Sequence, residues 1–250
     1  MRLFLPPTTI TLDSPITLTD EPFNHVTKVL RMGVGQSLTL CDGEGTDYTA
    51  VIAHIEKKHA LLTVSDPRPN SNEPTLAVTL VAGLPKGSKI DTLIQKTVEL
   101  GVAHLVFVET NRSNVNKKDL DKPNKRERLH KIALAAAQQS QRGRVPTITL
   151  ATFEQMVAQF EADVSPHKLG ILCYEAEGDN GIRRVLNQHP TLAHLYLFTG
   201  PEGGFTPAEV GQAKQAGIHT VSLGPRILRT ETAGIIGVGI ALYAYGDMEA

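Results

Sequence analysis

The sequence predicts an α/β protein: a mainly parallel sheet with helices in the larger C-terminal part, preceded by a small β-rich domain. Three observations lead to this class. Apolar strands alternate with amphipathic helices beyond residue 73, short β-favouring runs separated by turns occupy residues 1–72, and a proline-rich stretch lies between the two. With 250 residues, 41% of them apolar and 20% charged, the chain can bury a core in each part.

The N-terminal part has the two-residue period of β-strands. SLTLCDGEG turns at Asp42-Gly43, and TAVIAHIEKKHALLTVSD alternates apolar with polar residues. Ser65–Pro74 then contains three prolines and several Asn and Ser residues, which resist regular structure. We therefore predict two domains, residues 1–72 and residues 73–250.

The C-terminal part alternates between the two periods. The segment KGSKIDTLIQKTVELG has apolar residues at helical spacing and a glycine stop at Gly101. The predicted strands are LAVTLVAG, HLVFVET, LGILCY, HLYLFTG and HTVSLG. Alternation of this kind is typical of a mainly parallel sheet.

Cysteine usage and hydropathy predict a reduced, cytoplasmic protein. Cys41 and Cys173 are far apart and lack the spacing of a metal site, so no metal is expected. Pro6 and Pro7 interrupt the apolar start, which disfavours a signal peptide. The apolar stretch Ala233–Tyr245 is shorter than the ~20 residues that span a bilayer. We expect a buried helix there and no membrane association.

Positive charge is concentrated in one window although the net charge is only −1. Ten of the 25 Lys and Arg residues lie between Arg112 and Arg144, against Asp119, Asp121 and Glu127. Localised cations attract a phosphate backbone. A solvated loop and helix face is the alternative interpretation.

Two glycine-containing loops follow strands near the C-terminus. In LYLFTGPEGGFTPAEV the strand runs into Gly200–Gly204, and Thr206 with Glu209 predicts a capping box at the next helix. In VSLGPRILRTETAGIIG a strand runs into Gly224 and is followed by an apolar helix. Glycines let backbone groups approach a ligand, and two such loops can enclose one pocket, although a tight turn looks similar. Neither loop has the dinucleotide or P-loop fingerprint, which disfavours a dehydrogenase or an NTPase.

The segments TGPEGGFTPAEV and SLGPRILRTETA resemble the signature loops of the RsmE family, the small-subunit ribosomal RNA uridine-N3 methyltransferases of the SPOUT superfamily. MRLFLPP, HVTKVLRMGVGQSLTLCDGEG, KGSKIDTLIQKTVELGV and NRSNV extend the resemblance over nearly the whole chain. It implies a C-terminal trefoil knot, a PUA-like β-barrel that binds RNA, S-adenosyl-L-methionine as cofactor, and a homodimer. The implied partner is ribosomal RNA or the small ribosomal subunit.

Carried over position by position, the resemblance implies three cofactor-binding segments. The first comprises Thr199, Gly200, Pro201, Glu202, Gly203 and Gly204; the second comprises Ser222, Leu223, Gly224, Ile227, Leu228 and Arg229; the third comprises Cys173, Tyr174 and Glu175.

Methylating N3 of uridine requires loss of its imide proton, so a base and a cation near the carbonyl oxygens are expected. Arg229 and Glu231 are the candidates for charge stabilisation and for the base, unless they simply pair with each other. The candidate RNA contacts, which could equally be solvated surface residues, are Arg2, Lys28, Arg31, Arg112, Arg142 and Arg144.

Two other functions stay open. A SPOUT methyltransferase acting on a ribose 2′-hydroxyl or on transfer RNA would have a similar cofactor pocket. A catalytically silent RNA-binding assembly factor would use only the N-terminal domain.

Overall fold

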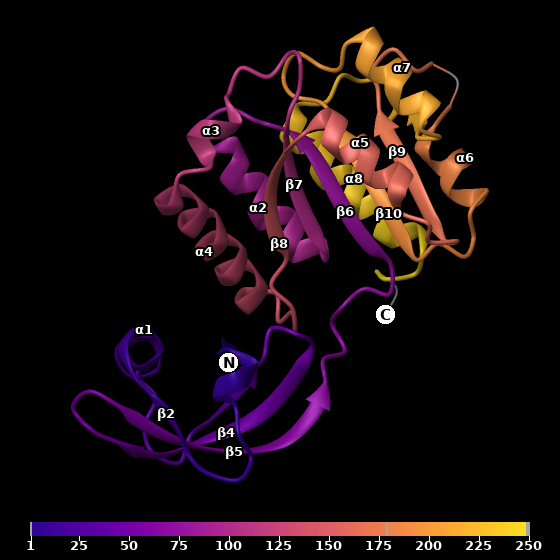
Figure 1. Cartoon of the computed structure of the whole chain (residues 1–250). Helices are drawn as coiled ribbons and strands as arrows, with labels where there is room; N and C mark the ends of the chain where they lie inside the picture. Colours follow the sequence, from indigo (N-terminus) through magenta and orange to yellow (C-terminus); the bar gives the residue numbers. More distant parts are fainter. Residues whose placement is uncertain (1, 179, 249–250) are drawn as a thin grey trace. The chain divides into compact units, whose positions relative to one another are not determined.

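The computed structural model describes residues 2–178 and 180–248 and divides the chain into two compact units (Figure 1). The first unit comprises Met1–Glu73 together with Ala137–Val145, and the second comprises Pro74–Ala136 with Pro146–Ala250. The chain therefore leaves the second unit after residue 136 and re-enters it at residue 146. Sequence patterns did not predict this return segment.

The first unit is a five-stranded sheet in the order β1-β3-β4-β5-β2. β1 pairs with β3 in parallel, and the other neighbours are antiparallel. Its strands are β1 (Arg2–Phe4), β2 (Ile16–Leu18), β3 (Ser37–Cys41), β4 (Thr46–Ile55) and β5 (Ala60–Pro69). The predicted β-rich N-terminal domain is confirmed.

Short helical segments lie between β1 and β3 along the chain. A 3-10 turn, η1 (Pro7–Thr9), precedes β2, and α1 (Asp20–Asn24) continues into a π-helical turn, η2 (His25–Val29). Phe23 and Val26 point into a core with Leu40, Ile52 and Leu62. The turn is followed by Arg31 at a φ of 53°, a left-handed conformation that is unusual outside glycine.

The second unit is built on a six-stranded, wholly parallel sheet in the order β11-β9-β10-β6-β7-β8. The strands are β6 (Ala77–Gly83), β7 (His104–Glu109), β8 (Thr147–Thr152), β9 (Lys168–Cys173), β10 (His194–Thr199) and β11 (His219–Val221). Because the strands are parallel, all of their carboxyl ends lie at one edge. This confirms the predicted parallel α/β domain.

Helices connect the strands and cover both faces of the sheet. α2 (Lys89–Leu100) and α8 (Thr230–Ala244) pack together on one face, and α5 (Phe153–Ala162) and α7 (Pro207–Gln215) lie on the other (Figure 1). The remaining helices are α3 (Lys117–Leu120), α4 (Pro123–Gln139) and α6 (Ile182–Asn187). Side chains of β10 alternate between the faces, as a strand covered on both sides requires: Tyr196 and Phe198 join the α5 and α7 core, while Leu197 contacts α8.

α8 is the helix predicted for the last apolar stretch, but it is buried on one side only: Val238, Ala241 and Leu242 are buried, whereas Ile236 and Tyr243 are exposed. A Cβ on Gly234 would lie 2.8 Å from Leu93 Cδ1, and one on Gly237 would lie 2.7 Å from Leu197 Cδ2, so glycine permits the close approach of α8 to the sheet. None of the helices in the described part of the chain has the length and apolar character needed to cross a bilayer. The trefoil knot, the closure of the first sheet into a barrel, and the boundary at residues 72 and 73 stay predictions.

Candidate functional site

The loops at the carboxyl edge of the parallel sheet form the candidate site. The first glycine loop (residues 199–205) leaves β10 and passes directly beside the end of β6. A Cβ on Gly83 would lie 2.4 Å from Pro201 N and 2.9 Å from Gly200 C, which is backbone against backbone. Only glycine at position 83 lets this loop sit where it does.

Hydrogen bonds from neighbouring loops hold the first glycine loop at several points. Lys86 N and Lys89 Nζ donate to Glu202 Oε1 at 3.1 and 2.9 Å, and an Arg112 guanidinium NH donates to Gly203 O at 3.1 Å. At the start of α7 the predicted capping box is present between Thr206 and Glu209. Glu209 Oε1 also accepts from Asn111 N at 2.8 Å, which ties the loop after β7 to this helix.

The third predicted segment, at the end of β9, connects the other two. Tyr174 N donates to Val221 O at 2.9 Å, at the start of the second glycine loop. A Cβ on Gly204, whose φ is 67°, would lie 2.7 Å from Glu175 Oε1. Burial raises the pKa of the Cys173 thiol to about 12, so this thiol is neutral at physiological pH and is not a nucleophile.

The second glycine loop (residues 222–229) is held at its start and more exposed beyond it. Ser222 N donates to Asn180 O, and Ser222 Oγ accepts from Gly224 N, which has a φ of 111°. Leu223 and Leu228 are half-buried, whereas the Ile227 side chain is 89% exposed. Ile227 is thus an apolar side chain that is available for contact with a ligand.

Lys89 links the first glycine loop to the start of α8. Its Nζ lies 2.9 Å from Glu202 Oε1 and 3.9 Å from Glu231 Oε2. Burial raises the pKa of Glu202, but the hydrogen bonds from Lys89 and Lys86 outweigh it and leave that pKa below its usual value. The Tyr174–Val221 hydrogen bond joins the third segment to the start of the second, and Glu175 lies beside Gly204 of the first. The three predicted segments therefore lie together, with Lys89 between the first of them and the start of α8.

Two polar atoms in this region are buried and have no hydrogen-bond partner among the described residues: Thr199 Oγ1 and Glu231 Oε2. Buried polar atoms in native proteins are nearly always satisfied, so these two atoms are candidates for contact with a ligand. Arg2 Nε, Asp91 Oδ1 and His189 Nδ1 are also unsatisfied among the described residues, so the position of the two atoms at the loops is what distinguishes them. Glu231 has Lys89 as its ion-pair partner. Arg229 is exposed at the N-cap of α8, so mutual pairing of Arg229 and Glu231 is not what the structure shows.

Two of the six predicted RNA contacts need correction. Arg2, whose side chain is 8% exposed, forms a bidentate ion pair with Asp47. Arg142, whose side chain is 3% exposed, pairs with Glu73. Glu73 Oε1 also accepts from Gly143 N, which fixes the return segment in the first unit. Cations buried against carboxylates are structural. Neither side chain presents its charge to a phosphate.

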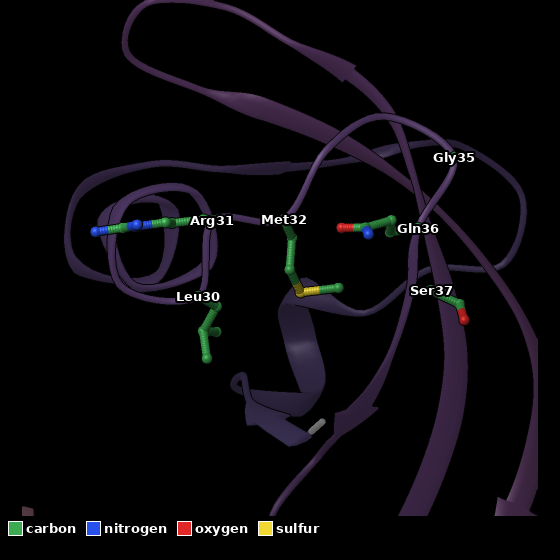
Figure 2. A pocket seen from close by; sticks show the side chains of 6 residues that line it. All are labelled: Leu30, Arg31, Met32, Gly35, Gln36 and Ser37. Carbon is green, nitrogen blue, oxygen red and sulfur yellow. The ribbon is translucent and has the colours of Figure 1, made fainter.

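Lys28, Arg31 and Arg144 in the first unit are exposed, as the prediction requires. Arg31 also lines an open surface hollow of about 620 Å³ (Figure 2). The other residues around this hollow are Leu30, Met32, Gly35, Gln36 and Ser37. The hollow combines a cation with apolar and amide side chains.

The basic window is less positive than its count suggests. In the second unit, Lys122 pairs with Asp119, Arg126 with Asp121, Arg128 with Asp91 and Lys131 with Glu127. Exposed pairs of this kind contribute little stability, but they neutralise charge that a phosphate backbone would otherwise meet. Arg112, the other predicted contact in this unit, is exposed but donates to the first glycine loop.

Sequence reasoning missed Lys89 and Asn111 as site residues. One signal for Lys89 was present: a lysine in the first turn of a helix lies at the unfavourable, positive end of the helix dipole unless carboxylates compensate it. Asn111 acts through its backbone N–H, which no side-chain pattern reveals.

Among the described residues, no group of three or more His, Cys, Asp or Glu side chains is arranged to hold a metal ion.

The comparisons with known proteins agree with this arrangement. The family model of the RNA methyltransferase domain matches residues 71–242, and that of the RNA methyltransferase PUA domain matches residues 18–65. The parallel sheet with its loop cluster, preceded by a PUA domain, therefore defines an RNA methyltransferase.

The relatives narrow this class. The chain is 31% identical to the ribosomal RNA small subunit methyltransferase E of Bacillus subtilis, over 91% of this chain and 89% of the relative. It is 35% identical to the protein of the same name in Synechocystis, over 95% and 75%. The crystal structure of the Neisseria gonorrhoeae enzyme of that name, bound to S-adenosyl methionine, has a TM-score of 0.84 and 27% identity, and covers 98% of this chain and 97% of that one. The chain belongs to the ribosomal RNA small subunit methyltransferase E family, which confirms the resemblance seen in its glycine loops.

Proposed function

We propose that this protein uses S-adenosylmethionine to methylate N3 of a uridine in small-subunit ribosomal RNA. The observation that carries the proposal is the clustering of the three loop segments around unsatisfied polar atoms, in a chain whose relatives are small-subunit RNA methyltransferases. Cytoplasmic location, a homodimer and a knotted C-terminal segment belong to the same proposal.

The residues at the site fit this cofactor. The Thr199 hydroxyl needs a hydrogen-bond partner. The glycines leave room for a ligand to approach the backbone closely; they are Gly200, Gly203, Gly204 and Gly224. Leu223, Ile227 and Leu228 offer apolar surface for an adenine. We assign cofactor binding to the three segments, residues 173–175, 199–204 and 222–229. When bound, S-adenosylmethionine supplies an electrophilic methyl group.

Glu231 and Arg229 have the chemistry that the uridine requires. The N3 proton passes to the Glu231 carboxylate, whose Oε2 is shielded from solvent and free to accept. The electron pair left on the ring spreads over the two carbonyl oxygens, and the exposed Arg229 guanidinium stabilises that charge. The ring nitrogen, now nucleophilic, would take the methyl group: the new N–C bond would form as the methyl–sulfur bond breaks, and the electron pair of that bond would stay on sulfur.

The first unit supplies RNA affinity in this proposal. Lys28 and Arg31 flank the end of the π-helical turn, and Arg144 is exposed in the return segment. Reversing the charge of Lys28 and Arg31 together is expected to weaken RNA binding. The slope of log K against log salt should fall by about 0.7–0.9 for each phosphate that is no longer neutralised. An unchanged slope would remove this surface from the proposal.

Comparing ribosomal RNA from cells with and without this gene, by nucleoside mass spectrometry, tests the function. Loss of one 3-methyluridine from small-subunit RNA is expected. Loss of a 2′-O-methyl group or of a transfer RNA modification would support the alternative substrates. Unchanged RNA, with no heat on titration of the protein with S-adenosylmethionine, would favour a silent binding protein.

A further inference from the structure

Lys89 lies between two carboxylates of the site without being part of either glycine loop. It stands in the first turn of α2, with Glu202 of the first glycine loop on one side and Glu231 of α8 on the other. About a third of its side chain is exposed, against 24% for Glu202 and 16% for Glu231. The ammonium is therefore partly shielded, where it acts more strongly on its neighbours than on the open surface.

The two distances differ in a way that matters chemically. Lys89 Nζ hydrogen-bonds Glu202 Oε1 at 2.9 Å but stays 3.9 Å from Glu231 Oε2, which is beyond hydrogen-bond distance. Glu231 Oε2 therefore lies in the field of the cation while its lone pairs remain unused. A carboxylate oxygen whose lone pairs are unused can still accept a proton from a third group.

Removing the cation would change both acids. Without this ammonium, the carboxylates on its two sides would repel each other, and the Glu231 carboxylate would lose the charge that attracts it to its present position. Glu202 has a second donor in Lys86 N, at 3.1 Å, so the first glycine loop keeps one anchor when Lys89 is lost. The consequence should fall mainly on Glu231.

We propose that Lys89 is a positioning residue for methyl transfer: held by Glu202, it attracts the Glu231 carboxylate and keeps it in place at the site while leaving Oε2 free to take the uridine proton. This inference rests on the proposed function, in which Glu231 is the base. It also makes the first glycine loop and the base interdependent, because one lysine connects them.

The test is a double-substitution cycle in the full-length protein, with tritiated S-adenosylmethionine and small-subunit RNA as substrates. Lys89→Gln should lower kcat at saturating cofactor by about tenfold or more. Because it also removes one hydrogen bond to the first glycine loop, cofactor affinity by calorimetry should fall by no more than about two- to tenfold. Lys89→Arg, which keeps the charge, should recover most of the rate. Lys96→Gln is the matched control, because Lys96 lies further along α2 and pairs with Glu99.

The decisive comparison is with Glu231→Gln. If Lys89 acts through Glu231, the Lys89→Gln, Glu231→Gln double variant should be no slower than Glu231→Gln alone. The inference would be overturned if the rate losses of Lys89→Gln and Glu231→Gln multiply in the double variant. It would also be overturned by a wild-type rate for Lys89→Gln, or by a rate loss that weaker cofactor binding explains entirely. Thermal unfolding of every variant separates these results from misfolding. Full turnover by Glu231→Gln would remove the base of the proposed function and this inference with it, and a wild-type protein that methylates no RNA would overturn the proposed function itself.

Discussion

The two edges of the parallel sheet are built from different chemistry. At the carboxyl edge lie glycine loops, exposed backbone, a lysine between two glutamates, and unsatisfied atoms on Thr199 and Glu231. At the amino edge, polar side chains of neighbouring strands bond to one another. His194 Nε2 lies 2.9 Å from Thr79 Oγ1, and His104 Nδ1 lies 2.8 Å from Thr147 Oγ1.

The amino-edge cluster extends to the end of α5. Tyr196 OH donates to Asp163 Oδ2 at 3.0 Å, and the rings of His194 and Tyr196 lie 4.2 Å apart. A polar network that satisfies itself contributes to stability and leaves little for a ligand. In α/β proteins, ligands bind outside the carboxyl ends of the parallel strands, where polar groups are left free to contact them. From this difference we expect ligand binding at the carboxyl edge and a contribution to stability at the amino edge.

The largest effect is expected from Gly83→Ala, at the carboxyl edge. The new Cβ meets the backbone of Gly200 and Pro201, which cannot give way as a side chain can, so the first glycine loop must move. We expect S-adenosylmethionine binding to weaken by more than about tenfold, or ~1.4 kcal/mol, in calorimetry. Gly211→Ala in α7 is the control, because a Cβ there has no neighbour within 4 Å. Equal affinities for the two variants would contradict the position of the loop.

Arg112→Gln sharpens the comparison, because this residue was predicted to bind RNA yet donates to Gly203 O. Losing one hydrogen bond of about 0.5–1.5 kcal/mol should weaken cofactor binding by about two- to tenfold in the absence of RNA. If cofactor affinity is unchanged and only the salt dependence of RNA binding falls, Arg112 belongs to the RNA surface instead.

The amino edge should be sensitive to acid. Desolvation lowers the pKa of the half-buried His194 and of His104, whose residue stays exposed, below the ordinary 6.5, although Asp163 opposes the shift at His194. The unfolded chain therefore binds protons that the folded chain does not, so this stabilisation is complete above about pH 6.5 and is lost as the pH falls below it. The melting temperature should drop between about pH 8 and pH 5, by 2–4 °C for each kcal/mol or so lost.

The double variant His104→Asn, His194→Asn should flatten this pH dependence of the melting temperature. His54→Asn is the control and should leave it unchanged, because the His54 side chain is 59% exposed and lies in the other unit. A pH dependence that is the same in all three proteins would assign it to other groups.

Tyr196→Phe should have the smallest effect. It removes the hydrogen bond to Asp163, which we expect to cost about 1 kcal/mol of unfolding free energy and to leave cofactor affinity unchanged. Denaturant unfolding and calorimetry measure the two quantities. A large loss of cofactor binding would show that the two edges are not independent.

The sequence was informative wherever local rules decide the structure. Strand and helix periodicity predicted the parallel sheet, and Thr206 and Glu209 predicted the capping box at α7. The short, glycine-containing apolar stretch predicted the helix α8, although Ile236 and Tyr243 leave one side of it exposed. The RsmE resemblance identified the loops that the fold brings together.

Long-range pairing was not predictable in the same way. A surface arginine and a buried, paired one look alike in sequence, so Arg2 and Arg142 were placed in an RNA surface that the Asp47 and Glu73 ion pairs exclude. The return segment 137–145 has no signal, because its partner Glu73 lies more than sixty residues away. Lys89 was not predicted as a site residue for the same reason: its two carboxylates come from distant parts of the chain.

A crystal structure of this protein with S-adenosylhomocysteine tests the central claim most directly. We expect density for the ligand enclosed by residues 173–175, 199–204 and 222–229, with the Thr199 hydroxyl hydrogen-bonded and Ile227 covered. Density at the amino edge of the sheet, or a ligand bound while these three segments stay uncovered, would contradict it.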